Sequence, residues 1–293
     1  MNRRHFLKSV PFSAVAPSLL TDSAFKNLFS AEDPDTEICL NKFKLAVSLE
    51  LQSKPIGDVI VEIGKSFLGT EYLAHTLEEP GEEHLVINLR GFDCVSFYEN
   101  CLVLARCIKK NEMTFEAFKK ELQFIRYRGG VINGYPSRLH YTSDYFYDNV
   151  RKGVVRDVTR EIGGVPYEKA VNFMSTHVDS YIKLKGKPDV VKLVAEQEEE
   201  ITKRPKFYLP KDRVAEAAAK IHNGDILGIT TNIEGMDITH TGLAVWQNGE
   251  LHFMHAPITG AKVQITDLTL ADYLAKIGKD TGIMVVRPLE PRS

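Results

Sequence analysis

The spacing of apolar residues changes once along this chain, near Gly224, and this change restricts the folds open to it. Upstream, apolar residues recur every three or four positions, as in amphipathic helices, over 58–67, 93–110 and 114–126. Downstream, short β-rich runs separated by turn residues cover 225–231, 239–247, 251–255, 262–266 and 283–286. Helices first and strands later predict an α+β fold, with helices packed on one face of an antiparallel β-sheet.

Two further segments interrupt the helical part. Residues 129–147 are rich in Gly, Pro, Tyr and Ser, so we expect a long irregular loop of the kind that binds substrates. Residues 183–221 are charged and helix-prone, and the run 198–200, three glutamates, is expected on a solvated helix face. The whole of 31–293 is expected to be a single domain with a helical insertion around 165–221.

The N-terminus has the composition of an export signal. The basic start Arg3-Arg4-His5-Phe6-Leu7-Lys8 and the small, apolar stretch after it resemble a twin-arginine signal. The stretch departs from that pattern in carrying two prolines, and its best cleavage site, at 14–16, precedes Pro17. We expect residues 1–30 to direct export to the periplasm; the alternative is the polar end of a cytoplasmic protein. No other stretch reaches the roughly 18 apolar residues of a membrane span, so no transmembrane segment is expected.

Charge and cysteine content exclude several classes of protein. The chain of 293 residues has 37 Lys and Arg against 39 Asp and Glu, a net charge of -2, so it lacks the basic field that attracts nucleic acid. Its four cysteines include no C-x-x-C pair, which argues against a disulfide-built fold and against a zinc site. We therefore expect no nucleic-acid partner, no metal and no cofactor.

Cys94 stands out among the cysteines. It follows Asp93, a good N-cap residue, at the start of the predicted helix 93–110, where the helix dipole favours a thiolate. Along the axis of the same helix, Cys101 lies roughly 10 Å beyond Cys94, and Cys107 lies roughly 9 Å beyond Cys101. These distances are too long for disulfides, so Cys101 and Cys107 are expected to be structural. The alternative for Cys94 is a buried, unreactive thiol.

A predicted hairpin brings two histidines together. Asn248-Gly249 is a strong signal for a two-residue turn, and this register places Gly242 opposite His255. His240 and His255 then share a face as diagonal neighbours, with Cα atoms roughly 7–8 Å apart. Gly242 and Ala244, on the same face, are expected to leave room for the helix that carries Cys94. A cysteine nucleophile, a histidine base and a second group that orients the base are what acyl transfer requires. The alternative is that these histidines are ordinary core or surface residues.

Several motifs in order resemble one known family. The segments 92–97 (FDCVSF), 224–227 (GDIL), 239–242 (THTG) and 255–256 (HA) are similar to the NlpC/P60 papain-like cysteine peptidases of bacterial cell-wall metabolism. The segments 68–72, 76–78, 138–144 and 235–240 resemble the DUF1460 group, which is described as N-acetylmuramoyl-L-alanine amidase-like. The resemblance runs from about residue 55 to the C-terminus.

This resemblance implies roles for individual residues. Cys94 would be the nucleophile, His240 the general base and His255 the residue that orients it. Tyr72, between Glu71 and Leu73, matches a tyrosine near the family's active site, although Glu71 replaces the usual proline. Cleft-lining residues that would contact the substrate are Arg138, Tyr141, Asp144 and Asp237. For Arg138 and Asp144 the alternative is an ion pair in a surface loop.

The implied reaction belongs to cell-wall turnover. It is hydrolysis of the amide between the lactyl group of N-acetylmuramic acid and L-alanine in peptidoglycan fragments, with no metal. Three alternatives stay open. The chain could cleave the γ-D-glutamyl-diamino acid bond of the stem peptide, act as a cysteine acyltransferase, or bind muropeptides without turnover.

Overall fold

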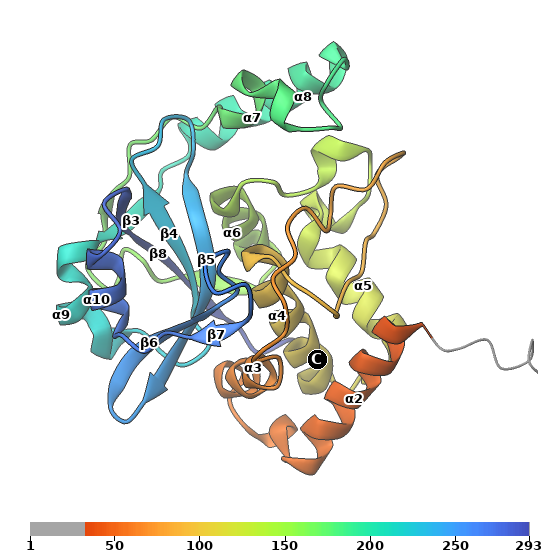
Figure 1. Cartoon of the computed structure of the whole chain (residues 1–293), viewed down its shortest axis with the longest axis vertical. Coiled ribbons are helices and arrows are strands. Elements are labelled where there is room, and N and C mark those ends of the chain that lie inside the picture. The colour runs from red at the N-terminus through yellow and green to blue at the C-terminus, as the bar shows by residue number, and fades with distance from the viewer. Residues whose placement is uncertain (1–32, 293) are drawn as a thin grey trace, which may run out of the picture. The chain divides into compact units, whose positions relative to one another are not determined.

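The computed structural model describes residues 33–292, and the expected export signal at 1–30 lies outside them. Residues from Pro34 onward form one compact unit. Within it, five helices gather on one side of an antiparallel sheet, as Figure 1 shows. These helices are α2 (Pro34–Ser48), α3 (Ile56–Lys65), α4 (Cys94–Lys110), α5 (Phe115–Arg126) and α6 (Thr142–Arg151).

Helix α4 is the centre of the helical layer. It begins at Cys94 because the Asp93 carboxylate accepts hydrogen bonds from the Val95 and Ser96 backbone N–H groups, while the Ser96 hydroxyl accepts from the Asp93 N–H. It ends at Asn111, whose backbone lies in the left-handed region that closes helices. The three predicted helices are therefore confirmed to within a few residues of their expected ends.

The sheet is open and entirely antiparallel. Its order is β2-β3-β8-β4-β5-β6-β7, and β1 also pairs with β8. The strands are β1 (Val155–Asp157), β2 (Val165–Pro166), β3 (Phe207–Pro210), β4 (Ile226–Thr231), β5 (Ile238–Gln247), β6 (Glu250–His255), β7 (Gln264–Ile265) and β8 (Asp280–Pro288). The α+β class and the predicted strands downstream of Gly224 are confirmed.

Apolar clusters cover both faces of the sheet, which corrects the expectation that helices pack on one face only. Leu243, Val245 and Met254 join the larger core with α3 and α4. Ala244 and Phe253 point the other way, into a second cluster with the short helices α9 (Val214–Ala217) and α10 (Leu270–Ala275). Period-two alternation on β5 and β6 therefore serves two cores rather than a core and solvent.

Two expectations about irregular segments need correction. The loop expected over 129–147 ends early, because α6 begins at Thr142. The expected helical insertion at 165–221 contains α7 (Phe173–Thr176), α8 (Pro188–Lys203) and α9, but β2 and β3 within it extend the sheet. Single turns of 3-10 helix complete the fold at Leu51–Ser53, Arg128–Gly130, Tyr135–Ser137, Val178–Ser180, Lys211–Arg213 and Ala218–Lys220.

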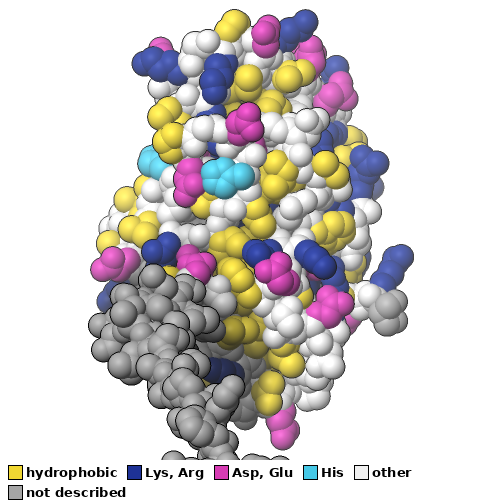
Figure 2. Space-filling view, turned by 90° about the vertical axis from the view of Figure 1, so that its right-hand side faces the viewer, with side chains coloured by type: hydrophobic (Ala, Val, Ile, Leu, Met, Phe, Trp, Pro, Cys, Tyr) yellow, Lys and Arg dark blue, Asp and Glu magenta, His cyan; other side chains and the backbone are white. Residues whose placement is uncertain are grey.

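The surface has mixed charge, in line with the nearly neutral total. On the face drawn in Figure 2, Lys and Arg alternate with Asp and Glu among apolar side chains. No helix within residues 33–292 combines the length and the apolar character needed to cross a bilayer.

Candidate active site

Cys94 is the first residue of α4, where the backbone N–H groups point out of the helix. Asp93 occupies two of these donors, because its carboxylate accepts from the N–H groups of Val95 and Ser96. Within the described chain, the N–H of Cys94 has no such partner. The helix start therefore leaves one backbone donor beside the sulfur.

His240 and His255 form a hydrogen-bonded pair across β5 and β6. The strands pair with Leu243 opposite Met254, which is the register that Asn248-Gly249 predicts. Nε2 of His240 lies 2.7 Å from Nδ1 of His255, and the ring centroids are 4.9 Å apart. With Nε2 of His240 engaged in this way, Nδ1 is the ring nitrogen left for another partner.

A hydrogen bond joins the helix of the cysteine to the strand of the histidine. The Thr241 hydroxyl donates to the carbonyl oxygen of Cys94 at 2.8 Å. Helix α4 thus approaches β5 on the face of Thr241, Leu243 and Val245. The expectation that Gly242 and Ala244 leave room for this helix is wrong. Gly242 is needed on the other side, where a Cβ atom would lie 2.9 Å from Cβ of His255.

Cys94 and His240 line the same cavity, which has a volume of about 530 Å³. This size is typical of sites for small ligands. Its wall comes from segments far apart in sequence: the 75–78 loop, the start of α4, the 138–142 turn, residues 173–182 around α7, and residues 236–241. Among the residues proposed from the sequence, the lining includes Arg138, Tyr141 and Asp237 besides Cys94 and His240.

Burial keeps the reactive groups neutral. Burial raises the pKa of the Cys94 thiol to about 11; the Asp93 charge adds to the rise, and hydrogen bonding to Thr241 opposes it. Burial, with a smaller contribution from Lys279, lowers the pKa of His240 to about 4. Burial and then His240 lower the pKa of His255 to about 3. The expectation that the helix start favours a resting thiolate is therefore not met, because desolvation and the Asp93 charge outweigh the hydrogen bonds that lower the pKa of the thiol.

Tyr72 lies close to Cys94 but outside the lining of the cavity. Its backbone N–H donates to the carbonyl oxygen of Ala261 at 2.7 Å, and Tyr72 pairs with Phe92, two residues before Cys94. Its pKa is raised by burial first and then by the nearby Cys94 and Asp93. Leu73, the next residue, is exposed and packs beside Gly91.

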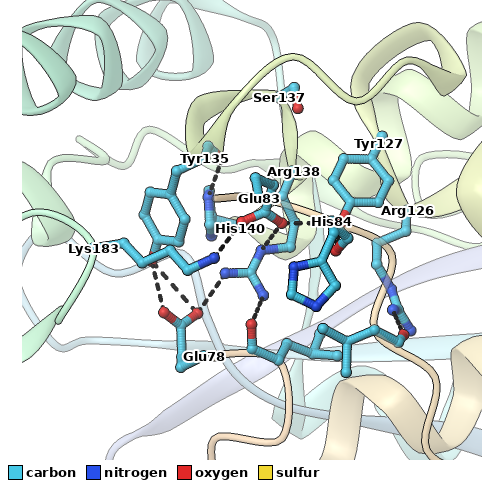
Figure 3. Close-up of polar contacts among 12 residues, drawn as sticks. Glu78, Glu83, His84, Arg126, Tyr127, Tyr135, Ser137, Arg138, His140 and Lys183 are labelled. Atoms are coloured by element: carbon cyan, nitrogen blue, oxygen red, sulfur yellow. Dashed lines mark hydrogen bonds and ion pairs between the residues drawn. The ribbon is translucent and has the colours of Figure 1, made fainter. Parts of the chain in front are cut away.

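Arg138 is held in a buried polar network, shown in Figure 3. Its guanidinium bonds Glu78 at 2.6 Å and the carbonyl oxygen of Leu77 at 2.7 Å, and lies 3.3 Å from Glu83. Residues 173–203, which we call the arm, carry Lys183, whose amino group lies 3.1 Å from the Glu83 carboxylate. Arg138 lines the cavity, but its charge is paired with these partners, and the pairing holds the surrounding loops together.

Tyr141 also lines the cavity and is tied to α8. Its hydroxyl donates to Glu198 at 2.6 Å and accepts from the Met174 N–H at 2.8 Å. Glu198 is only 2% exposed, so the expectation of a solvated face is wrong for this glutamate, while Glu199 and Glu200 are exposed as expected.

The two aspartates proposed as substrate contacts are both buried. Asp237 lines the cavity, but its carboxylate accepts from the N–H groups of Ser143 at 2.8 Å and Ile238 at 2.7 Å. Asp144 does not line this cavity, contrary to the expectation. It is 1% exposed and pairs with Arg128 at 2.7 Å and with Arg204. The alternative of an ion pair describes Asp144 better, although the pair is buried rather than on a surface loop.

Two residues near the site were missed. His140 lines the cavity, and its Nε2 lies 2.8 Å from the carbonyl oxygen of Tyr135. It falls inside the 138–144 motif, so the motif itself was the available signal. Tyr273 of α10 contacts the His255 ring, with centroids 5.4 Å apart. Nothing in the local sequence points to Tyr273, because sheet topology alone brings α10 to β6.

The other cysteines lie away from this chemistry. Cys101 and Cys107 are buried free thiols, as expected of structural residues, and Cys39 is a buried free thiol as well. Within residues 33–292, no group of three or more His, Cys, Asp or Glu side chains is arranged to hold a metal ion.

Comparisons with known proteins agree on one family. A model of the AmiA-like family, described as N-acetylmuramoyl-L-alanine amidase-like, matches residues 62–283. A search of curated proteins found no match. Among solved structures, an N-acetylmuramoyl-L-alanine amidase from Bacteroides uniformis is 36% identical with a TM-score of 0.76, over 80% of this chain and 98% of that one.

Two further structures are similar. A Bacteroides fragilis protein, named provisionally as a xylanase, is 39% identical with a TM-score of 0.73, over 76% of this chain and 98% of that one. Protein LPG0564 of Legionella pneumophila, from family DUF1460, is 24% identical with a TM-score of 0.63, over 86% and 95% of the two chains, and supports the fold alone. The match over residues 62–283 and the extent of the Bacteroides similarities show that the chain belongs to the AmiA-like family of N-acetylmuramoyl-L-alanine amidase-like proteins.

Proposed function

We propose that this protein is a cysteine amidase that hydrolyses the bond between N-acetylmuramic acid and L-alanine in peptidoglycan fragments. One observation carries the proposal: Cys94 at the start of α4 and the hydrogen-bonded His240 of β5 line one cavity. Family membership and the Bacteroides uniformis amidase support the choice of bond. We also propose that the fold is the papain-like fold of the NlpC/P60 superfamily, and that residues 1–30 direct export to the periplasm.

The neutral resting state determines the order of proton transfers. His240 removes the thiol proton at Nδ1 as the Cys94 sulfur attacks the amide carbonyl, because neither group is charged beforehand. The backbone N–H of Cys94 is placed to stabilise the oxyanion. His240 then gives its proton to the leaving amine of L-alanine. Finally His240 removes a proton from water, which attacks the thioester. The bond to sulfur breaks, His240 returns its proton to the Cys94 thiolate, and the lactyl group leaves as a carboxylic acid that ionises in solution.

His255 acts on this reaction through His240. It is 1% exposed and is not among the residues that line the cavity. We take Nδ1 of His255 as the acceptor of the Nε2–H of His240 in their 2.7 Å contact, an assignment that leaves the lone pair of His240 at Nδ1. In this tautomer His240 can act as a base toward the thiol.

The name of the Bacteroides fragilis neighbour raises glycoside hydrolysis as a competing activity. That chemistry needs two carboxyl groups available on either side of the bond. Each carboxylate that lines the described cavity is already engaged. Glu78 pairs with Arg138, Glu99 pairs with Arg126, and Asp93 and Asp237 bond backbone N–H groups. The engaged carboxylates favour amide hydrolysis by the cysteine.

Product analysis tests the proposed bond. Full-length protein would be incubated with a defined anhydro-muropeptide, and the products would be identified by mass spectrometry. The expected products are a disaccharide with a free lactyl carboxylate and a stem peptide with free N-terminal L-alanine. A peptide cut after γ-D-glutamate would show the stem endopeptidase instead. Transfer to an added amine would show an acyltransferase, and recovery of intact substrate a binding module.

Two cysteine-to-alanine variants provide a matched test of the nucleophile. Cys94→Ala is expected to abolish turnover while the protein stays folded. Cys101→Ala, on the same helix but fully buried, is expected to lose stability and keep its activity. Turnover near the wild-type rate in Cys94→Ala would exclude cysteine catalysis.

A further inference from the structure

Nε2 of His255 is a buried polar atom without a partner in the described chain. The other ring nitrogen, Nδ1, bonds His240. A buried donor or acceptor left unpaired destabilises a folded protein, so such an atom beside a reactive group calls for an explanation.

Two aromatic rings contact the imidazole that carries this atom. The centroid of Phe253 is 4.6 Å from that of His255, with the planes inclined by 43°. The centroid of Tyr273 is 5.4 Å away, with the planes inclined by 85° in an edge-to-face arrangement. Phe253 also contacts Tyr273 at 5.7 Å and His240 at 5.7 Å. These two residues, Phe253 and Tyr273, form what we call the aromatic box.

The box explains how one tautomer can be selected. If a water reached Nε2 of His255, that ring could donate or accept there, and either tautomer would be satisfied. In the described chain Nε2 is buried without a hydrogen-bonding partner, beside two aromatic rings, and an N–H group interacts with an aromatic ring better than a lone pair does. The proton on Nε2 then leaves Nδ1 as the acceptor for His240.

We propose that Tyr273 is a positioning residue, whose ring closes the aromatic box and so holds His255 as the Nε2–H tautomer and His240 as a base at Nδ1. The proposal rests on the proposed function, because it assigns Tyr273 a part in the same reaction. Tyr273 is suited to this place because α10 is anchored by the buried Leu270 and Leu274. Its phenol stays neutral, since burial, Asp280 and Cys94 all raise its pKa.

The charged and titratable groups around the histidine pair come from three elements. Asp93 caps α4 and Cys94 is its first residue, Tyr273 belongs to α10, and Lys279 directly precedes Asp280, the first residue of β8. Lys279 acts on His240 by charge alone, with no hydrogen bond to the pair. Opening the box would admit water and raise the pH at which His240 becomes protonated.

The test compares three tyrosine variants of the full chain. The rate at which iodoacetamide alkylates Cys94 would be measured against pH by peptide mass spectrometry, together with kcat/KM. Tyr273→Phe keeps the ring, so the pH at which both rates fall on the acid side of the profile, the acid limb, is expected to stay unchanged. Tyr273→Ala is expected to move that limb upward by about one pH unit or more. Tyr208→Ala is the matched control, because Tyr208 is a half-buried tyrosine that contacts Tyr167 rather than the histidines.

Wild-type protein gives a second readout that needs no variant. Nitrogen NMR of the imidazoles near neutral pH is expected to show both His240 and His255 as Nε2–H tautomers. A proton on Nδ1 of His255, or an acid limb unmoved in folded Tyr273→Ala, would overturn the proposal. The proposed function fails separately, if Cys94 of the wild type is alkylated no faster than the buried Cys101.

Discussion

The hydroxyl of Thr241 donates a hydrogen bond of 2.8 Å to the carbonyl oxygen of Cys94. Thr241 follows His240 directly on β5, so this bond fixes the strand of the proposed base against the helix of the proposed nucleophile. It is also buried, which makes its loss costly.

Thr241→Val tests this relationship, because valine keeps the shape and removes the donor. We expect a loss of about 1 kcal/mol in unfolding free energy and a drop of about tenfold in kcat/KM from misplacement of the reacting groups. Thr230→Val is the control, since Thr230 is also buried and its hydroxyl bonds Thr281 at 2.8 Å, but Thr230 does not line the cavity. Equal activity loss in both variants would contradict a specific role for Thr241.

The pH dependence of activity should reflect the buried base. His240 accepts a proton only when neutral, and its pKa is lowered from 6.5 to about 4. Activity should therefore persist as pH falls through 6 and 5, and decline only near pH 4. The measurement is kcat/KM against pH in buffers where the protein stays folded. An acid limb near pH 6.5 would show that His240 is solvated during turnover.

How much of this site was predictable from sequence depends on the range of the interactions. The Asp93 cap, the Asn248-Gly249 turn and the pairing of His240 with His255 follow from local rules, and each was found where expected. The resting charge of Cys94 was not predicted correctly, because desolvation depends on what covers the sulfur. The bulge that leaves Thr239 out of the pairing of β4 with β5 just before His240 has no local signal either.

Helix α6 shows the same limit in the fold. Its first turn, at Thr142, has no side-chain cap of its own. The cap is the carboxylate of Asp237, 94 residues later, which bonds the Ser143 N–H. The local sequence therefore predicts that the loop continues past Thr142. The helix starts there because a distant residue accepts a hydrogen bond from its first turn.

Asp237 variants can separate this structural role from substrate contact. Asp237→Ala should reduce the unfolding free energy by about 1–2 kcal/mol, as loss of a helix cap does, whereas Asp237→Asn keeps one acceptor oxygen for the Ser143 N–H and should recover part of it. Thermal unfolding and KM would be measured on both variants. A raised KM in both, with unchanged stability, would instead restore Asp237 as a substrate contact.

Stability should fall on acidification because His255 is buried in its neutral form. In the unfolded chain it binds a proton below about pH 6.5, but in the folded protein its pKa is about 3. The unfolded state therefore binds more protons between these values, and the unfolding free energy decreases as pH falls from 6.5 toward 3. His255→Asn removes this titration and keeps an acceptor for His240. Between pH 7 and pH 5, denaturant unfolding of the wild type should lose roughly 2 kcal/mol more than that of the variant. Equal losses would mean that His255 is protonated in the folded protein.

Glu198 gives a prediction about the arm that covers the cavity. Its carboxylate accepts from the Tyr141 hydroxyl at 2.6 Å and from the Ser175 N–H at 3.1 Å, so it joins α8 to the cavity wall and to α7. Glu198→Ala should release this arm, and amide hydrogen exchange over 173–203 should accelerate while α4 stays protected. The neighbouring variant Glu199→Ala, at an exposed position of the same helix, should leave exchange unchanged. Since Phe173, Met174 and Tyr181 of the arm line the cavity, KM should rise in Glu198→Ala more than kcat falls. Faster exchange across the whole domain would instead indicate global destabilisation.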